Sequence, residues 1–351
     1  MDGARRDRPV AAADPSPIVR SMSEPVRTAA IGLGAIGTRI VAAFAAHPQH
    51  TLVAVCDTSG ARADAVARQH AVPAYTDHAA MLAAERPALV YVAVPPRFHR
   101  DVVADVVASG AHVLCEKPLA LSAADGRDML ARAEQAGRTH ALNIGLHYDP
   151  GIRLFLAELA KGWIGDVVRI AIDLVFPEWP RQWQRNDWIA KREQGGPVRE
   201  CTPHLFHVLR RGFGEVARLR ADVRYGAEPD ACERSANGVL ELSSGLLVDV
   251  RVLTNVPRAE EVRLTVYGER GTLGLEGWRR PVSAKERGPL EPMSVPTASD
   301  PFPVGTELAL AVRGEAADLV TFADGIALQR IQDAWDEAAR SGLWVTVSDR
   351  T

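Results

Sequence analysis

Residues 26–37 read VRTAAIGLGAIG, an apolar run that leads directly into a glycine pattern. The run predicts a buried strand, and the residues after it predict a helix with one apolar face. The pattern between them is G-x-G-x-x-G, formed by Gly32, Gly34 and Gly37. Asp57 follows twenty residues after the last of these glycines, at the end of a second apolar run. In this context the pattern predicts a dinucleotide-binding βαβ unit.

Each position of the pattern has a physical reason. Gly32 permits a tight turn, Gly34 lets the backbone approach a pyrophosphate, and Gly37 allows close packing of helix against strand. A helix that begins at Ala35 and Ile36 offers unpaired N–H groups and partial positive charge to the phosphates. We therefore expect these five residues to bind a nucleotide cofactor. The alternative is a glycine-rich turn without a ligand.

Asp57 bears on the choice of cofactor. Its carboxylate can accept hydrogen bonds from the adenosine ribose hydroxyls, whereas a 2′-phosphate there would meet a negative charge. Thr58 and Ser59 bring no cation, and Arg62 is the nearest one. The sequence therefore favours NAD over NADP. The alternative for Asp57 is a solvated loop residue or a helix cap.

The rest of the first half alternates between strand and helix patterns. Expected strands lie at 51–57, 88–94, 111–115 and 138–144, and expected helices at 60–70, 76–86, 97–109 and 122–136. Alternation at this spacing predicts a parallel sheet with helices on its faces. We assign residues 26–145 to an N-terminal Rossmann domain in an α/β fold.

The second half has a different pattern. Apolar and polar residues alternate in the runs 167–174, 246–252 and 262–266, which is typical of an antiparallel sheet with one covered face. Expected helices lie at 151–161, 306–318 and 323–341, and a long loop is expected over 279–305. We assign residues 146–351 to a C-terminal α+β domain with an open, mostly antiparallel sheet. Its last helix is expected to pack back on the Rossmann domain.

Composition limits the partners. Among 351 residues, 41 Lys and Arg nearly balance 44 Asp and Glu, which argues against nucleic acid or an anionic membrane. The four cysteines are far apart without a C-x-x-C pair, and no apolar run reaches the ~20 residues of a membrane span. We expect a cytoplasmic protein. Residues 1–25 predict a disordered tail, and Met22 is a possible second start of translation.

Two further segments carry candidate chemistry. Cys115-Glu116-Lys117-Pro118 ends an expected parallel strand, where side chains face the ligand crevice. Residues 195–207 read GGPVRECTPHLFH. Together with the glycine pattern, the E-K-P and the G-G followed by an acid-x3-His resemble the glucose–fructose oxidoreductase, inositol dehydrogenase and MocA (Gfo/Idh/MocA) family. This resemblance in layout spans residues 26–347.

The resemblance implies an active site between the two domains and an NAD- or NADP-dependent oxidoreductase. The family chiefly oxidises a secondary alcohol of a sugar or polyol, or reduces the matching carbonyl. Its catalytic lysine matches Lys117, and its Asp and His, four residues apart, match Glu200 and His204. Residues 94–99, VPPRFH, resemble the family's T-P-x-x-x-H segment, with Pro95 in place of Thr. Cofactor contacts are thus implied for five more residues, Val94, Pro95, His99, Glu116 and Lys117.

Local signals suggest how the catalytic residues would act. Thr202 before Pro203 predicts a helix that begins there, with His204 in its first turn, where the helix dipole disfavours imidazolium. A neutral His204 can take the proton of a substrate hydroxyl while Lys117 stabilises the same oxygen. Because Glu200 would lie outside that helix, we expect no metal on Glu200, His204 and His207. His207 is expected to pack beside the site or to touch substrate.

Residues 177–188, PEWPRQWQRNDW, are rich in tryptophan and arginine. Trp179 and Trp183 can stack on a sugar ring, and Arg181 and Arg185 can hold a carboxylate or phosphate. The sequence therefore includes anionic sugar-like compounds among the candidate substrates. The alternative is that these side chains only pack an ordered loop.

Two other functions remain open from the sequence. The altered acid-x3-His segment leaves room for a reductase of imines or other non-sugar compounds. A cofactor-sensing regulator without catalysis is the third possibility, although a sensor would need neither Lys117 nor His204. The family resemblance also implies a homodimer or homotetramer joined through the open sheet face.

Overall fold

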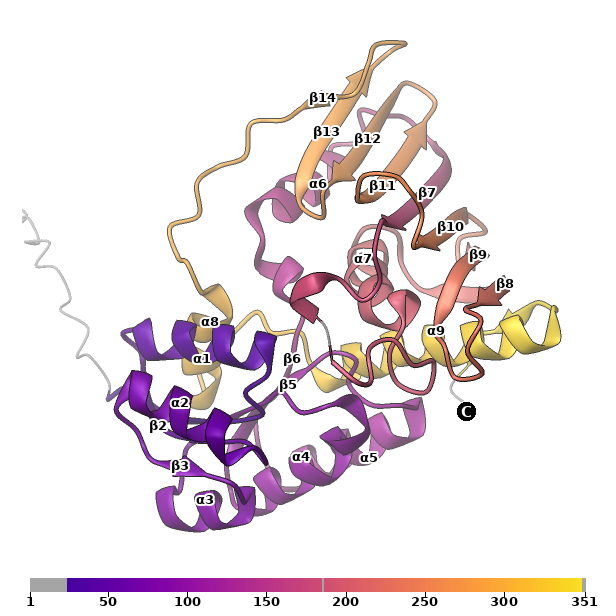
Figure 1. Cartoon of the computed structure of the whole chain (residues 1–351). Helices are drawn as coiled ribbons and strands as arrows, with labels where there is room; N and C mark the ends of the chain where they lie inside the picture. Colours follow the sequence, from indigo (N-terminus) through magenta and orange to yellow (C-terminus); the bar gives the residue numbers. More distant parts are fainter. Residues whose placement is uncertain (1–23, 185, 349–351) are drawn as a thin grey trace, which may run out of the picture.

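The computed structural model describes residues 24–184 and 186–348. The expected disordered tail up to residue 23, the second start at Met22, and Arg185 lie outside these residues. Figure 1 shows two domains, each built around its own sheet, with the C-terminal helix running along both. The α/β architecture predicted from the sequence is confirmed.

The first sheet has six parallel strands among the described residues, in the order β3-β2-β1-β4-β5-β6. This order is that of a dinucleotide-binding Rossmann domain. The strands are β1 (Val26–Ile31), β2 (His50–Cys56), β3 (Ala74–Tyr75), β4 (Leu89–Val92), β5 (His112–Glu116) and β6 (His140–Asn143). The helices are α1 (Ala35–Ala46), α2 (Gly60–His70), α3 (His78–Glu85), α4 (His99–Ala108) and α5 (Ala123–Gln135).

The second sheet has the order β14-β13-β12-β11-β7-β10-β9-β8-β15 within the described part of the chain. Strands β7 and β10 pair in parallel, and every other neighbouring pair is antiparallel. The strands are β7 (Val167–Phe176), β8 (Val216–Tyr225), β9 (Glu233–Leu242), β10 (Leu247–Thr254), β11 (Glu261–Gly268), β12 (Gly271–Glu276), β13 (Arg280–Lys285), β14 (Glu291–Pro292) and β15 (Val345–Thr346). Helices α6 (Pro150–Ala160) and α7 (Pro197–Phe213) pack near this sheet.

Alternation along the strands gives this sheet two unlike faces. Inward residues such as Ile172 and Val250 are buried in the core. The outer face carries ion pairs between neighbouring strands, including Arg169–Asp249 at 2.6 Å. A second pair, Arg251–Asp173, lies at 2.8 Å on the same face. The sheet is therefore covered on one side and polar on the other, as the alternating pattern predicted.

The structure corrects one expectation about the second half. Residues 279–305 are not one long loop, because β13 and β14 form an edge of the sheet within them. Val282 and Ala284 are buried there, two residues apart, in the period of a strand. The many Pro, Gly and charged residues around them conceal this short pattern.

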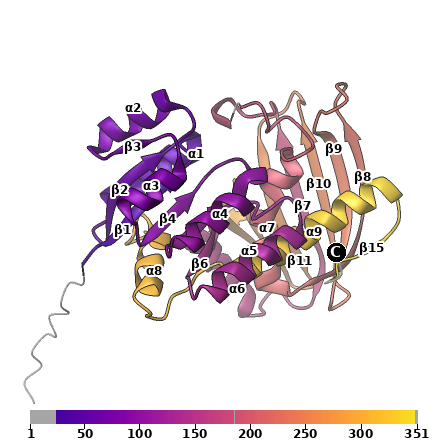
Figure 2. The same cartoon turned by 90° about the horizontal axis from the view of Figure 1, so that it is seen from below.

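Two C-terminal helices return to the first domain. Helix α8 (Pro303–Val312) packs on α1: the rings of Phe302 and Phe44 lie 4.9 Å apart, and His50 Nε2 lies 2.8 Å from the Gly305 carbonyl oxygen. Helix α9 (Phe322–Ser341) lies along α5, as Figure 2 shows, and Asp333 accepts a hydrogen bond from the Ala123 N–H. These contacts fix the orientation of the two domains around the site between them.

In the described residues, no helix has both the length and the apolar character needed to cross a membrane.

Candidate active site

The glycine turn between β1 and α1 is shaped as the sequence predicted. Gly32 has φ +94°, and a Cβ there would lie 2.5 Å from the Ala93 backbone, so a side chain cannot fit. A Cβ on Gly37 would lie 2.1 Å from the Gly32 carbonyl oxygen. A Cβ on Gly34, in contrast, would meet no described atom within 4 Å. The turn is therefore packed tightly on one side and open at Gly34, where a pyrophosphate could approach the backbone.

Helix α1 begins at Ala35, which is exposed, while the neighbouring Ile36 is half-buried. Its N-cap is Gly34, so within the described residues no side chain caps the first N–H groups. These groups remain free for an anion, and the dipole of a helix of twelve residues favours one there. The geometry fits the phosphates of a dinucleotide.

Asp57 directly follows β2, next to this turn. Its Oδ2 accepts a hydrogen bond from the Leu33 N–H, and its Oδ1 accepts one from the Ser59 N–H, both at 2.8 Å. Arg62, which is half exposed, lies 3.4 Å from the same carboxylate. The carboxylate is thus held in a fixed position between the glycine turn and α2.

The segment after β4 lies on the same edge of the sheet. Val94 and Pro95 are half-buried, in position to border a cofactor. His99 differs from its expected role because it is fully buried, with both ring nitrogens facing backbone carbonyls. Its Nε2 lies 2.9 Å from Val94 O and its Nδ1 lies 3.0 Å from Pro118 O. His99 therefore ties the two loops together and presents no polar atom to a cofactor.

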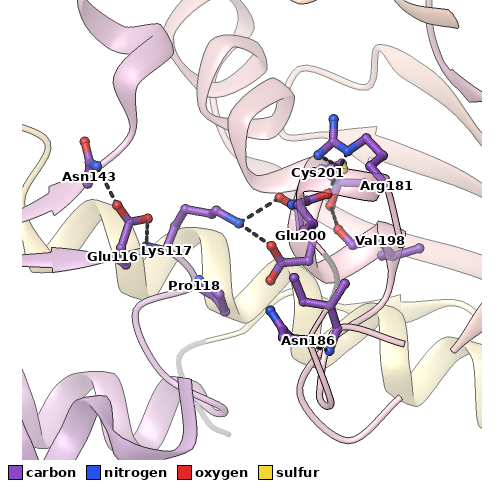
Figure 3. Close-up of polar contacts among 12 residues, drawn as sticks. Glu116, Lys117, Pro118, Asn143, Arg181, Asn186, Val198, Glu200 and Cys201 are labelled. Atoms are coloured by element: carbon purple, nitrogen blue, oxygen red, sulfur yellow. Dashed lines mark hydrogen bonds and ion pairs between the residues drawn. The ribbon is translucent and has the colours of Figure 1, made fainter. Parts of the chain in front are cut away.

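Glu116 ends β5, Lys117 follows it, and their side chains diverge. Glu116 is buried, and it accepts hydrogen bonds from Tyr91 at 2.7 Å and from Asn143 at 2.6 Å. Burial raises the pKa of Glu116, while these donors and nearby Lys117 oppose the rise. Lys117 points the other way, toward the second domain, as Figure 3 shows.

Lys117 Nζ joins the two domains at Glu200 of α7. It lies 2.7 Å from Glu200 Oε2 and 3.1 Å from the Glu200 carbonyl oxygen. Burial alone would lower the pKa of Lys117, but the Glu200 carboxylate outweighs it and the net pKa is raised. The other oxygen, Glu200 Oε1, is buried without a hydrogen-bond partner among the described residues. The lysine is therefore held as an ammonium, beside an acceptor that is still available.

The structure corrects the expected start of α7. The helix begins at Pro197 with Gly196 at its N-cap, and Pro203 lies inside it. Thr202 does not cap the helix, because its hydroxyl donates to the Val198 carbonyl within the helix. Pro197, and not Pro203, occupies the first helical position. Glu200 therefore lies inside the helix rather than before it.

This correction places Glu200, His204 and His207 on one stripe of α7, at i, i+4 and i+7. The prediction that Glu200 lies outside this helix was wrong. A group of three His, Cys, Asp or Glu side chains able to hold a metal is still not found among the described residues. The carboxylate of Glu200 is engaged by Lys117, and His207 by another histidine.

His204 lies one turn beyond Glu200 and is half-buried. Burial, followed by the charge of Lys117, lowers its pKa to about 3. The expected helix-dipole cause does not apply, because His204 lies well inside α7. Its ring meets Trp278 edge-on, with the centroids 5.9 Å apart. His204 is thus a neutral imidazole near the Lys117 ammonium.

His207 is 3% exposed. Its Nε2 lies 3.0 Å from Nδ1 of His147, which is equally buried. This burial and the contact with His147 favour packing beside the site over a substrate contact.

Arg181 lies next to α7 among four aromatic rings, which we call its aromatic surround. Its guanidinium lies 4.8 to 5.8 Å from four ring centroids, those of Phe176, Trp179, Trp183 and Trp278. The side chain is 16% exposed, bonded to Gln184 and 3.7 Å from the Glu260 carboxylate. Figure 3 shows it beside Cys201, close to Glu200.

The tryptophans of this segment differ from one another. Trp179 is buried against Phe176 and donates to the Ile189 carbonyl, so it supports Arg181 and does not face a substrate. Trp183 is half exposed and remains available for stacking. Arg185 lies outside the described residues.

Sequence reasoning missed several residues of the site. Asn143 ends the neighbouring parallel strand β6, so the edge rule that pointed to Lys117 could have found it. Tyr91 lies inside β4 and carried no such signal. Trp278 and Arg279 come from the turn before β13, far along the chain, and Arg279 lowers the pKa of His204. Only the fold brings that turn to α7.

The fold and this arrangement define a class: oxidoreductases with a dinucleotide-binding domain and a lysine facing a second, sheet-based domain. The chain belongs to the Gfo/Idh/MocA family. Residues 26–144 match the "Oxidoreductase family, NAD-binding Rossmann fold" and residues 154–274 match the "GFO/IDH/MocA C-terminal domain". The resemblance drawn from the sequence is confirmed, and the protein is an oxidoreductase.

The relatives are sugar and polyol dehydrogenases. D-apiose dehydrogenase of Paraburkholderia graminis is 29% identical over 64% of this chain and 60% of that protein. Inositol 2-dehydrogenase of Rhizobium meliloti is 26% identical over 88% of this chain and 95% of that protein. The WlbA dehydrogenase of Bordetella pertussis, solved with NADH and UDP-GlcNAcA, is 20% identical, with a TM-score of 0.80 over 92% of this chain and 99% of that one. This structural match shows the common fold.

Proposed function

We propose that the protein transfers hydride between a nicotinamide cofactor and a secondary alcohol, or its carbonyl, of a sugar- or polyol-like compound. The observation that carries the proposal is the Lys117–Glu200 contact of 2.7 Å, which joins the edge of the Rossmann sheet to α7. His204 follows one turn later, beside the same ammonium. A regulator that only senses cofactor has no use for this arrangement.

The chain's own groups handle the oxygen and its proton. The bound nicotinamide would accept the hydride. Lys117, kept charged by Glu200, would donate a hydrogen bond to the substrate oxygen and stabilise the charge that develops there. Neutral His204 would take the hydroxyl proton at Nε2. Glu200 Oε1, which lacks a hydrogen-bond partner among the described residues, would accept a hydrogen bond from a neighbouring hydroxyl of the substrate.

For the cofactor we propose NAD rather than NADP. Asp57 is fixed by the Leu33 and Ser59 N–H groups, with its carboxylate where the ribose of a dinucleotide lies in this fold. Arg62 is already paired with that carboxylate, so it is not an unpaired cation for a 2′-phosphate.

For the substrate we propose a compound that bears an anionic group. Arg181 lies within the aromatic surround beside α7, where water competes weakly for its N–H groups. Arg279 adds a second positive charge near His204. A sugar carboxylate fits these two guanidinium groups, with Trp183 available to stack on the ring.

The test is the absorbance of reduced nicotinamide over a panel of sugars, sugar acids, inositols and other polyols, with NAD and NADP measured separately. We expect turnover with NAD, and a sugar acid to exceed its neutral parent in kcat/KM. If no compound is turned over while NADH still binds, the proposal fails in favour of imine reduction or cofactor sensing. Higher kcat/KM with NADP would overturn the cofactor assignment alone.

We also propose that copies of the chain associate through the outer face of the second sheet, and that the protein works in the cytoplasm. Half-buried Leu247 and exposed Tyr267 lie among the ion pairs of that face. All four cysteines are free thiols, as is usual in a reducing compartment. Light scattering of the wild type and of Leu247→Asp tests the first proposal, which predicts a dimer or tetramer that the substitution dissociates.

A further inference from the structure

Two buried histidines and a surface carboxylate form a continuous chain beside the site. His207 Nε2 lies 3.0 Å from His147 Nδ1, and His147 Nε2 lies 2.9 Å from Asp318 Oδ1. The imidazoles are 3% and 5% exposed, whereas the Asp318 side chain is 54% exposed. They come from α7, from the short helix η2 (Gly145–Tyr148) and from the segment between α8 and α9. The chain therefore leads from the interior to solvent.

Arg211 fixes the direction of these hydrogen bonds. Its Nη1 lies 3.3 Å from His147 Nδ1, and a guanidinium can only donate. His147 Nδ1 is therefore an acceptor, so the proton of this ring is on Nε2, facing Asp318. His207 must then donate from its own Nε2, which leaves His207 Nδ1 as a bare acceptor. The ring N–H groups of His207 and His147 therefore both point along the hydrogen bonds toward the surface.

The inner end of the chain lies next to His204. His204 and His207 are three residues apart on α7, so they are neighbours on one helix face. Nδ1 of each is buried without a hydrogen-bond partner among the described residues. A His204 that accepts a hydroxyl proton at Nε2 carries a proton on Nδ1, whereas His207 Nδ1 is an acceptor. One water molecule between them would satisfy both.

Burial disfavours a second proton on either inner histidine. Burial lowers the pKa of His204 to about 3 and that of His207 to about 3. Charges of both signs face these rings from the surrounding elements. They are Lys117, Arg181 and Arg279 at His204, Arg210, Arg211 and Asp324 at His207, and Arg153, Arg211 and Asp318 at His147. Among the three hydrogen-bonded residues His207, His147 and Asp318, it is Asp318 that both contacts a histidine and is exposed to solvent.

We propose that His207, His147 and Asp318 relay the proton of the oxidised alcohol from His204 to solvent, a step that rests on the proposed function. His204 releases its Nδ1 proton as it accepts one at Nε2. Each following ring accepts a proton on its inner nitrogen and releases the one on its outer nitrogen, and Asp318 passes it to water. One proton enters and one leaves, with no redox change. The rings end the transfer with the opposite nitrogen protonated, so each returns to its starting tautomer before the next oxidation.

The first test needs no substrate. The two-bond ¹⁵N couplings of the full-length protein, labelled with [¹⁵N]histidine, report which ring nitrogen carries the proton. His147→Gln and His207→Gln assign the signals. The relay requires the Nε2–H form for both residues at neutral pH. A His207 protonated on Nδ1 overturns it.

The second test follows single turnovers of the panel compound with the highest activity, in weak buffer. NADH is read by absorbance and the released proton by a pH indicator. We expect both to appear together in the wild type. In Asp318→Asn and His147→Gln, proton release should lag by about tenfold, and added imidazole should remove the lag. The matched control is Asp105→Asn, because Asp105 pairs with His78 at 2.8 Å on the surface, away from the site.

The outcomes separate the two proposals. A lag that imidazole does not remove indicates a structural role and overturns the relay, as does the absence of a lag in both variants. If the wild type turns over no panel compound, the proposed function has failed, and the tautomers alone decide whether the hydrogen-bond chain exists as described.

Discussion

The proposed cofactor side of the site is formed mainly by backbone groups, and the proposed substrate side mainly by side chains. On the cofactor side, the glycine turn and the first turn of α1 offer backbone N–H groups and open space at Gly34. On the substrate side, α7 and its neighbours offer side chains: Lys117 against Glu200, His204, and Arg181 among aromatic rings. A backbone site depends on where glycine is required, whereas a side-chain site depends on which residues the fold brings together.

This difference has a consequence for the freedom of each side to change. Any substitution at Gly32 or Gly37 meets backbone atoms at 2.5 Å or less. On the substrate side, Arg181 or Trp183 can be exchanged without changing the course of the chain. The two sides should therefore respond differently to mutation.

The largest effect is expected on the substrate side, from His204→Gln. Removal of the base should lower kcat by about 10²- to 10⁴-fold, because the hydroxyl proton has no acceptor. NADH affinity should not change. Steady-state kinetics and fluorescence titration measure the two quantities, with surface residue His78→Gln as control. A loss of NADH binding equal to the loss of kcat would contradict the division between the two sides.

Gly34→Ala tests the cofactor side without disturbing the fold. The added methyl group meets no described atom within 4 Å, so thermal stability should be unchanged. It would occupy the approach of the pyrophosphate, and NADH affinity should fall by about 5- to 150-fold. Gly60→Ala is the control, since its Cβ would make an ordinary 3.6 Å contact with Thr76. Unchanged NADH affinity would mean that phosphates do not bind at this turn.

Arg181→Gln tests the charge proposed for the substrate. Loss of a charged hydrogen bond should raise KM for an acidic substrate by about ten- to a hundredfold, with a smaller change in kcat. Neutral compounds of the panel should be affected little. Arg192→Gln is a matched control, because its guanidinium also lies over an aromatic ring, 5.3 Å from the centroid of Tyr225, but outside the rings that surround Arg181. Equal losses for acidic and neutral compounds would assign Arg181 to packing alone.

The smallest effect on activity is expected from Glu233→Gln, which changes stability. Burial raises the pKa of Glu233 to about 7, next to the N-cap of α7. Because the folded state then binds more protons than the unfolded one between about pH 4.5 and 7, the free energy of unfolding falls as pH rises through that window. Glu233→Gln should therefore stabilise the protein at pH 8 by about 3 kcal/mol, and much less at pH 5. Urea unfolding at both pH values measures this, with exposed Glu228→Gln as control, and an equal effect at both would contradict it.

The contrast between the backbone groups of one side and the side chains of the other also explains which features the sequence could predict. The glycine turn, the parallel order of the first sheet and the position of Lys117 follow from local rules, because backbone geometry demands glycine and strand ends share an edge. The start of α7 was misjudged because two prolines, Pro197 and Pro203, each fit the first helical position. Trp278 and Asp318 reach the site only through tertiary packing, which no local pattern encodes.

The account depends most directly on Lys117, where the two sides meet. NADH titration and turnover should be measured together for Lys117→Met and for Lys191→Met, whose lysine pairs with Asp230 at the same 2.7 Å but near the surface. We expect Lys117→Met to bind NADH as the wild type does and to lose turnover by 10²-fold or more, roughly the range of a lost electrostatic or proton-transfer group, while Lys191→Met retains both. Turnover that persists in Lys117→Met would contradict the account.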